Sequence, residues 1–331
     1  GMMEKTPPFS LDTTRYDQST WIGRTKHFFA VTNPAYLFTS EAQIKADQEA
    51  LERFKGGKRA AGESDDALWS ARTRLSAIIH PDTGKPIPPY FRVCAFVPAN
   101  IPICAGMLMA PPTTFNIVFW QWVNQSYNAG FNFANRNASS PMSNASIATA
   151  YTVATSLSIG IGLGMNRAVQ GAKSISPTTR AVLLRCTPFA AVGFSNVANL
   201  LSMRSGELSS GIPVTDKSGK ELGISKIAAQ SAVMQGAVTR FVLPAPVLVL
   251  PPIIMSQIEK VLPSLTKGSP RVKSALELGI IVCCVWGALP VAIGLFPQQA
   301  SIRASSLEKE FHGITGEDGE RVETLYFNKG V

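Results

Sequence analysis

Long runs without charge constrain this chain more than any other feature of its sequence. No Asp, Glu, Lys or Arg occurs in the 43 residues Val93–Asn135 or in the 30 residues Asn137–Asn166. A helix crosses a bilayer with about 20 predominantly apolar residues. Either block is therefore long enough to contain a membrane span. The alternative is a soluble all-α protein with very apolar core helices, but charge-free blocks that recur between short charged loops favour a membrane protein.

Apolar segments of span length follow one another along the middle of the chain. The candidates are Ala99–Trp120, Ile147–Met165, Ala181–Met203, Phe241–Ile258 (preceded by the less apolar Ile227–Thr239) and Leu278–Ile302. We therefore predict an all-α, polytopic membrane protein with about five transmembrane helices. Whether 93–135 forms one span or a span plus a half-helix is open at this stage.

The N-terminal part of the chain differs from the middle in composition. Residues 1–92 contain 13 Lys/Arg and 11 Asp/Glu, evenly mixed, as is typical of a soluble domain. There, apolar spacing predicts an amphipathic helix over Ser40–Phe54, and Ser64 followed by two aspartates predicts a second helix start. We expect a small soluble N-terminal helical domain over 1–92, a transmembrane domain over 93–302 and a soluble C-terminal tail over 303–331.

Neutral amides are concentrated in WQWVNQSYNAGFNFANRN, residues 120–137. If this segment is helical, its polar side chains share about a third of the circumference, and aromatic and small residues cover the rest. The polar side chains are Gln121, Asn124, Gln125, Asn128, Asn132, Asn135 and Arg136. Three roles fit such a face: a transport pathway, hydrogen bonds between helices, or a wet surface at the membrane boundary.

A transport pathway is chemically reasonable because amides both donate and accept hydrogen bonds at any pH. A zwitterionic amino acid needs acceptors for its ammonium and donors for its carboxylate. Asn196, Asn199 and Arg240 lie elsewhere in the membrane block and are further candidates for substrate contact. Arg240 is either an anchor for a carboxylate or a residue that snorkels at a helix start.

The sequence does not indicate an enzyme, a metal site or a nucleic-acid-binding protein. It has no GxSxG, P-loop or HExxH motif, its five Cys and three His lack ligand spacing, and its net charge of +9 includes no Lys/Arg run longer than two. We expect no catalytic residue, metal or cofactor. The HPDTG motif comprises His80, Pro81, Asp82, Thr83 and Gly84. It is open to two interpretations: an acid–base pair of His80 and Asp82, or a turn stabilised by Asp and Thr side chains.

Distinctive motifs run through the whole chain. They are DQSTWIGRTKHFFAVTNP at 17–34, HPDTGKPI at 80–87, FWQWVNQSYNAGFNFANRN at 119–137, RSGELSSGIPVTDKSGKELGISK at 204–226, PAPVLVLPPIIM at 244–255, FPQ at 296–298 and YFNKG at 326–330. Together they resemble the sideroflexins, eukaryotic proteins of the mitochondrial inner membrane, and in particular the serine-transporting members of that family.

The resemblance implies five spans, uncleaved internal targeting and a multi-pass position in the mitochondrial inner membrane, with the N-terminus on the matrix side. It also implies transport of serine and other small neutral amino acids into the matrix for one-carbon metabolism. A count of basic residues near the predicted spans, nine on the N-terminal side against seven on the other, agrees with this orientation. The family pattern assigns no substrate residues to this chain.

Two other functions remain open. One is a non-transporting membrane scaffold that recruits partners through residues 1–92. The other is a tricarboxylate carrier, but citrate bears about three charges and calls for several intramembrane cations. Only Arg185 and Arg240 are candidates for that role. The sequence does not fix the oligomeric state.

Overall fold

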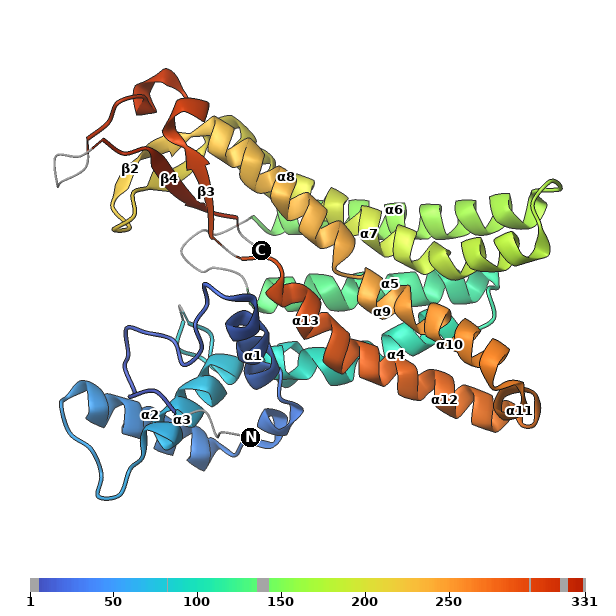
Figure 1. The fold of residues 1–331 in the computed structure, drawn as a ribbon, viewed down its shortest axis with the longest axis horizontal. Helices are drawn as coiled ribbons and strands as arrows, with labels where there is room; N and C mark the ends of the chain where they lie inside the picture. The colour runs from blue at the N-terminus through green and yellow to red at the C-terminus, as the bar shows by residue number, and fades with distance from the viewer. Residues whose placement is uncertain (1–5, 82, 136–142, 298, 316–320, 330–331) are drawn as a thin grey trace. The chain divides into compact units, whose positions relative to one another are not determined.

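The computed structural model describes residues 6–81, 83–135, 143–297, 299–315 and 321–329. The chain is mostly helical (Figure 1). It forms two compact units. The first unit contains Gly1–Met109, Tyr127–Pro141 and Ile254–Leu295, and the second contains Ala110–Ser126, Met142–Ile253 and Phe296–Val331. The chain passes between them within α5 (Thr114–Ala134) and α10 (Leu250–Val261).

The N-terminal helices of the first unit begin at capped residues. These helices are α1 (Trp21–Val31), α2 (Glu41–Lys55) and α3 (Asp65–Ile78). The side chains of Thr20, Ser40 and Ser64 each accept a hydrogen bond from a backbone N–H of the first turn, which satisfies a donor that has no partner within the helix. The helices expected from Ser40 and from Ser64 are thus confirmed.

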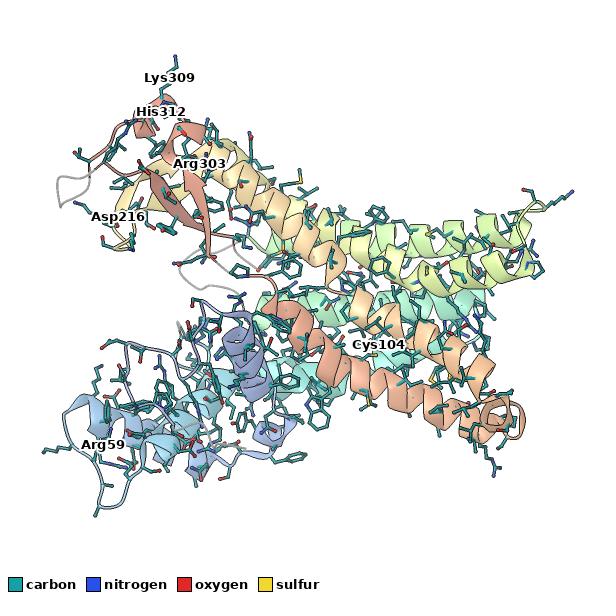
Figure 2. The ribbon with its side chains drawn as sticks, in the orientation of Figure 1. Arg59, Cys104, Asp216, Arg303, Lys309 and His312 are labelled. Carbon is teal, nitrogen blue, oxygen red and sulfur yellow. The ribbon has the colours of Figure 1, made fainter. Side chains whose placement is uncertain are left out.

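An ion pair joins α2 to α3, and an aromatic contact joins the N-terminal segment to α3. Asp47 is buried, and the guanidinium of Arg74 donates to both of its oxygens at 2.6 and 2.7 Å. Phe9 packs edge-on against Trp69, and the Trp69 indole donates to the carbonyl of Pro7 at 3.0 Å. The N-terminal segment is therefore fixed to α3. Arg59, in the loop between α2 and α3, is labelled in Figure 2.

Short helices connect this region to the remainder of the first unit. They are η1 (Pro34–Phe38), η2 (Pro89–Phe91) and η3 (Val93–Ala95), the last leading directly into α4 (Phe96–Met109). After α10 come α11 (Pro263–Lys267) and α12 (Pro270–Cys283), and α12 packs against α4. The π-helix η4 (Cys284–Ala288) continues α12 into α13 (Leu289–Gly294).

Long antiparallel helices form most of the second unit. They are α6 (Asn144–Gly171), α7 (Pro177–Ser210) and α8 (Lys226–Val242), followed by the short α9 (Ala245–Leu248). Glycines allow close approach between α7 and α8, because a Cβ on Gly193 would come within 3.0 Å of the Phe241 ring and one on Gly236 within 3.2 Å of Leu200. Small residues at helix contacts are typical of membrane bundles.

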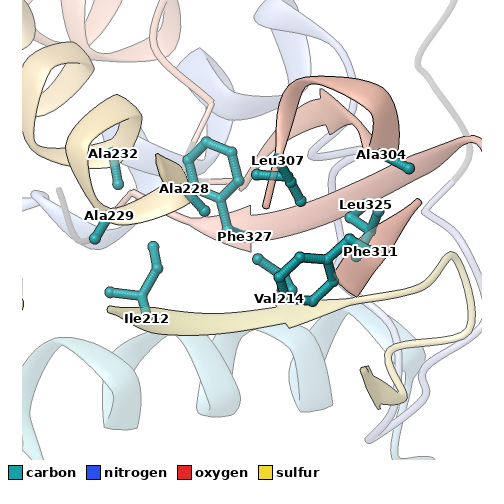
Figure 3. Close-up of a cluster of buried hydrophobic side chains, with 10 residues drawn as sticks. All are labelled: Ile212, Val214, Ala228, Ala229, Ala232, Ala304, Leu307, Phe311, Leu325 and Phe327. Atoms are coloured by element: carbon teal, nitrogen blue, oxygen red, sulfur yellow. The ribbon is translucent and has the colours of Figure 1, made fainter. Parts of the chain in front are cut away.

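A small antiparallel sheet completes the second unit. Its strand order is β2-β1-β4-β3, with β1 (Ile212–Thr215), β2 (Glu221–Ser225), β3 (Gln299–Arg303) and β4 (Thr324–Asn328). Strand side chains such as Ile212, Val214 and Phe327 pack with alanines of α8, as Figure 3 shows. The short helices η5 (Ala304–Ser306) and η6 (Lys309–Phe311) lie between β3 and β4 in the chain. The all-α prediction from the sequence contained no strand, so this sheet is a difference from it.

Four helices of the described chain are long and apolar enough to cross a membrane: Asn144–Gly171, Thr179–Ser210, Lys226–Val261 and Pro270–Gly294. They contain most of the last four predicted spans. The predicted span Ala99–Trp120 is not one helix, because α4 ends at Met109 and α5 begins at Thr114, with Pro111 and Pro112 between them. The prediction of Leu278–Ile302 is wrong at its end, since the helix stops at Gly294 and Gln299–Arg303 is a strand.

Candidate functional site

Helix α5 packs antiparallel to α6, and three contacts define their register. The hydroxyl of Ser158 donates to Gln121 Oε1, and Ser126 and Tyr151 share a hydrogen bond of 2.9 Å. Gly162 lies against Ile117, whose side chain would be 3.0 Å from an added Cβ. This register places Asn124 level with Ala154 and Thr155 on α6.

Helix α5 is also hydrogen-bonded to α7. Gln125 Nε2 donates to Ser195 Oγ at 2.7 Å, and that hydroxyl donates to the carbonyl of Val192 at 3.0 Å. Gln121 and Gln125 are only 3% and 2% exposed, and Ser158 and Ser195 are fully buried. The two glutamines therefore hold three helices together, which is the structural role of interhelical amides.

Five buried polar side-chain atoms on these helices have no hydrogen-bond partner within the described chain. They are Asn124 Nδ2 and Tyr127 OH on α5, Thr155 Oγ1 on α6, and Arg180 Nε and Asn199 Oδ1 on α7. A buried polar group without a partner costs roughly 1–3 kcal/mol, so such groups are rare unless something else binds them. Asn124, Thr155 and Asn199 contribute an amide donor, a hydroxyl and an amide acceptor, and none of them carries a formal charge. The charged member, Arg180, lies in the first turn of α7 and donates to the carbonyl of Ala172.

The second half of α5 belongs to the first unit and carries the remaining amides of the predicted stripe. Asn128, Asn132 and Asn135 are partly buried. Asn135 Nδ2 donates to the carbonyls of Phe91 and Phe131, each at 2.8 Å, so it fixes the end of α5 to the segment before α4. Arg136 lies outside the described residues.

Two arginines lie where α7 packs against α8: Arg204 on α7 and Arg240 on α8. Arg240 is partly buried and lies in the last turn of α8, so the expectation that it marks a helix start is wrong. Arg204 on α7 lies near α8 about one turn before Arg240, because a Cβ on Gly236 would be 3.8 Å from Arg204 Nη1. Arg204 pairs with Glu207 and donates to the carbonyl of Lys329. Asn196 is partly buried one turn before Asn199.

The HPDTG motif forms a tight turn after α3. His80 Nδ1 accepts from the Thr83 backbone N–H at 3.4 Å, and the Gly84 N–H donates to the His80 carbonyl at 2.9 Å. Gly84 has a positive φ of 65°, which glycine adopts without strain. His80 is buried and Pro81 is exposed, whereas Asp82 lies outside the described residues. The described part of the motif therefore has the hydrogen bonding of a structural turn.

The predicted site residues include no hydroxyl of α6, although Thr155 has an unpartnered hydroxyl and Ser158 bonds to Gln121. Thr155 and Ser158 were not singled out, although with Tyr151 they lie at i, i+4 and i+7 on one face of α6. That spacing was the available signal. Among the residues that the structure describes, no group of three or more His, Cys, Asp or Glu side chains is arranged to hold a metal ion.

Comparisons with known proteins cover nearly the whole chain. The family model described as Sideroflexins matches residues 10–331. Sideroflexin-5 of Homo sapiens is 40% identical over 98% of this chain and 94% of its own length, and the sideroflexin of Dictyostelium discoideum is 40% identical over 98% of each. Sideroflexin-3 of Homo sapiens is 37% identical over 97% of this chain and 98% of its own length.

No solved structure matches the chain. The helices of span length and these relatives fit a multi-pass membrane protein. The family model and the identities over almost the full length show that the chain belongs to the sideroflexin family.

Proposed function

We propose that the protein is a transporter of the mitochondrial inner membrane that moves serine and other small neutral amino acids into the matrix, where they supply one-carbon metabolism. Membership of the sideroflexin family supports a membrane transport role. The observation that carries the choice of substrate class is that Asn124, Thr155 and Asn199 each keep a buried, uncharged polar atom without a partner. The N-terminus lies on the matrix side in this proposal, in agreement with the excess of basic residues on that side.

We call the unpartnered atoms of Asn124, Thr155 and Asn199 the cluster. Their chemistry suits a small zwitterion. The Asn124 amide N–H₂ can donate to a carboxylate, and the Asn199 carbonyl oxygen can accept from an ammonium. The Thr155 hydroxyl both donates and accepts, and it can pair with the hydroxyl of serine. A neutral lining also avoids the cost of leaving a charged side chain buried when no substrate is bound. A substrate with net charge would lack a counter-ion at these atoms.

The other predicted site residues have supporting roles in this proposal. Asn128 and Asn132 continue the polar face of α5, and Arg240 offers a cation at the α7–α8 contact. Gln121 and Gln125 use their amides in hydrogen bonds to α6 and α7, and they position the helices that carry Asn124 and Asn199. Asn135 uses its amide within the first unit, in its bond to the carbonyl of Phe91.

Uptake of radiolabelled serine into proteoliposomes tests the proposal. We expect Asn124→Leu and Asn199→Leu to raise the KM for serine or abolish uptake, with a smaller effect for Asn128→Leu and Asn132→Leu. Gln230→Leu is the matched control, because Gln230 is an exposed amide on α8 outside the cluster. Each variant is checked for folded protein by size-exclusion chromatography before reconstitution.

The outcomes separate the alternatives. Wild-type uptake in both cluster variants would remove the role assigned to Asn124 and Asn199. Absence of serine uptake by the wild-type protein, together with stable retention of a partner through residues 1–92, would favour the scaffold. Uptake of citrate in preference to serine would favour a tricarboxylate carrier.

A further inference from the structure

Helix α1 has an unusual surface. Three of its residues are exposed, and all three are large and apolar: Trp21 at 45%, Ile22 at 60% and Phe29 at 38%. On a helix, Ile22 and Phe29 lie about 100° and 80° around the axis from Trp21, so the three share one face. The buried residues Gly23 and Val31 lie on the opposite side, at about 200° and 280°. Helices of soluble proteins show the reverse pattern, with polar residues on the open face.

Helix α1 is fixed to the end of a candidate membrane span in the same unit. The indole N–H of Trp21 donates to the carbonyl of Val291 at 3.1 Å, and Arg24 Nε donates to the carbonyl of Gly294 at 2.7 Å. Gly294 is the last residue of the Pro270–Gly294 span, and its missing side chain leaves room for Thr25. The distance of α1 from the membrane boundary is therefore set by the end of this span, because helix-end carbonyls bind it directly.

The exposed face of α1 lies beside exposed apolar side chains at the end of that span. Val291 and Leu295 are exposed at the end of α13, and Trp286 is exposed about one turn earlier. Apolar side chains of a membrane span that are open in the folded chain face lipid. Trp21 extends this surface, since its ring is exposed while its N–H is bonded to Val291. Tryptophan is enriched at the membrane boundary for the same reason: the ring is apolar and the N–H needs a partner.

We propose that the face formed by Trp21, Ile22 and Phe29 is a membrane-docking surface, on which α1 lies in the headgroup region of the bilayer beside the end of the Pro270–Gly294 span. Amphipathic helices bind in this way when bulky apolar side chains reach the boundary between headgroups and acyl chains. The docking is independent of the substrate and does not rest on the proposed transport function. Helix α1 then connects the N-terminal region to the lipid surface as well as to α13.

Spin-label accessibility in proteoliposomes tests this proposal in the full-length protein. The label is attached at Ile22→Cys in a background whose five native cysteines are replaced by alanine. Lys58→Cys, in the exposed loop before α3, is the aqueous control, and Leu278→Cys, at an exposed apolar position of the same span, is the lipid control. Collision rates are measured with oxygen, which partitions into lipid, and with a water-soluble nickel chelate.

The label at Ile22 is expected to collide with oxygen more often, and with the nickel chelate severalfold less often, than the label at Lys58. The ratio of the oxygen rate to the nickel rate for the label at Ile22 should fall between the ratios for the labels at Lys58 and Leu278. A position in the headgroup region requires this intermediate ratio. A ratio equal to that of Lys58 would overturn the proposal, because the face would then be in water. Low collision rates with both reagents would also overturn it, since the face would then be covered by protein, such as a second copy of the chain. Phe29→Cys provides a second reading if the label at Ile22 disturbs folding.

Discussion

The side-chain amide of Gln125 on α5 donates a 2.7 Å hydrogen bond to the hydroxyl of Ser195 on α7, 70 residues later in the chain. Both side chains are buried, and the bond is a direct link between these two helices. Together with the bond between Gln121 and Ser158, it sets the position of Asn124, whose amide N–H₂ has no partner within the described chain.

Removal of this link should weaken the helix bundle by a measurable amount. We expect Gln125→Leu and Ser195→Ala each to lower the free energy of unfolding, with a coupling energy of about 0.6 kcal/mol in the double-mutant cycle, the average for such bonds in membranes. Unfolding in mixed micelles with increasing denaturing detergent provides the measurement. Strictly additive effects of the two substitutions would show that the bond contributes nothing in the folded state.

The contact between α1 and α13 should depend on the absence of a side chain at Gly294. A Cβ at this position would collide with Thr25, so Gly294→Ala should loosen α1 and speed tryptic cleavage at Arg24 and Lys26. Gly279→Ala is the matched control in the same span, because a Cβ there meets nothing within 4 Å. Alanine also favours a helix over glycine by about 1 kcal/mol, so this control should be neutral or stabilising. Equal cleavage rates in the two variants would contradict the contact.

Two ion pairs of the N-terminal region should differ sharply in their effect on stability. Asp47 is buried beneath Arg74, whereas the side chain of Asp66, paired with Arg15 at 2.6 Å, is 59% exposed. Loss of one partner from a buried pair costs about 3–5 kcal/mol, whereas exposed pairs contribute about 0–1 kcal/mol. We therefore expect Asp47→Ala to make α2 and α3 much more sensitive to limited proteolysis in the reconstituted protein, and Asp66→Ala to change little. Similar sensitivity of both variants would be inconsistent with the burial of Asp47.

His27 on α1 should make the stability of this region depend on pH. Burial, and to a smaller extent the positive charge of Arg72, lower the pKa of His27 from its ordinary value of 6.5. As the pH falls through the ordinary value of 6.5, the unfolded chain takes up a proton at His27 that the folded chain does not. The free energy of unfolding therefore falls. The loss stops once the pH is below the lowered pKa of the folded state.

The comparison of His27→Gln with the wild type isolates this effect. Glutamine is polar but does not titrate, so the variant should lose less thermal stability between about pH 8 and about pH 5. Apparent melting temperatures at the two pH values, measured at one heating rate, provide the comparison. If the variant loses as much thermal stability in acid as the wild type, groups other than His27 cause the loss.

Local chemistry explains why parts of the fold were predictable. Ser40 and Ser64 provide side-chain oxygens where helices begin, and that interaction depends on residues within one turn. Long apolar runs indicate spans for an equally local reason, because each span must satisfy its backbone within itself. Pro111 and Pro112 mark the break between α4 and α5, but prolines also occur within α4 and α7, so proline alone does not locate a helix end.

Features that depend on distant residues could not be read from the sequence. Strand β4 pairs with β3 and β1, and Thr215 on β1 bonds to the Tyr326 carbonyl 111 residues away. The candidate site shows the same limit. The periodicity of α5 places its amides on one face, but it does not distinguish Gln125, which is satisfied by Ser195, from Asn124, which keeps an unpartnered donor. That distinction depends on which residues of α6 and α7 lie opposite.

The sheet of the second unit has a consequence for biosynthesis. Helices α7 and α8 and the β1–β2 hairpin are synthesised about a hundred residues before β4, yet β1 pairs with β4 and Arg204 binds the Lys329 carbonyl. Until Thr324–Lys329 have been translated, Val214 lacks its packing partners Leu325 and Phe327, and Arg204 lacks one of its acceptors, the Lys329 carbonyl. A chain that ends prematurely would present this uncovered patch to chaperones and proteases. The native packing of this sheet against α8 therefore forms only after Thr324–Lys329 have been translated.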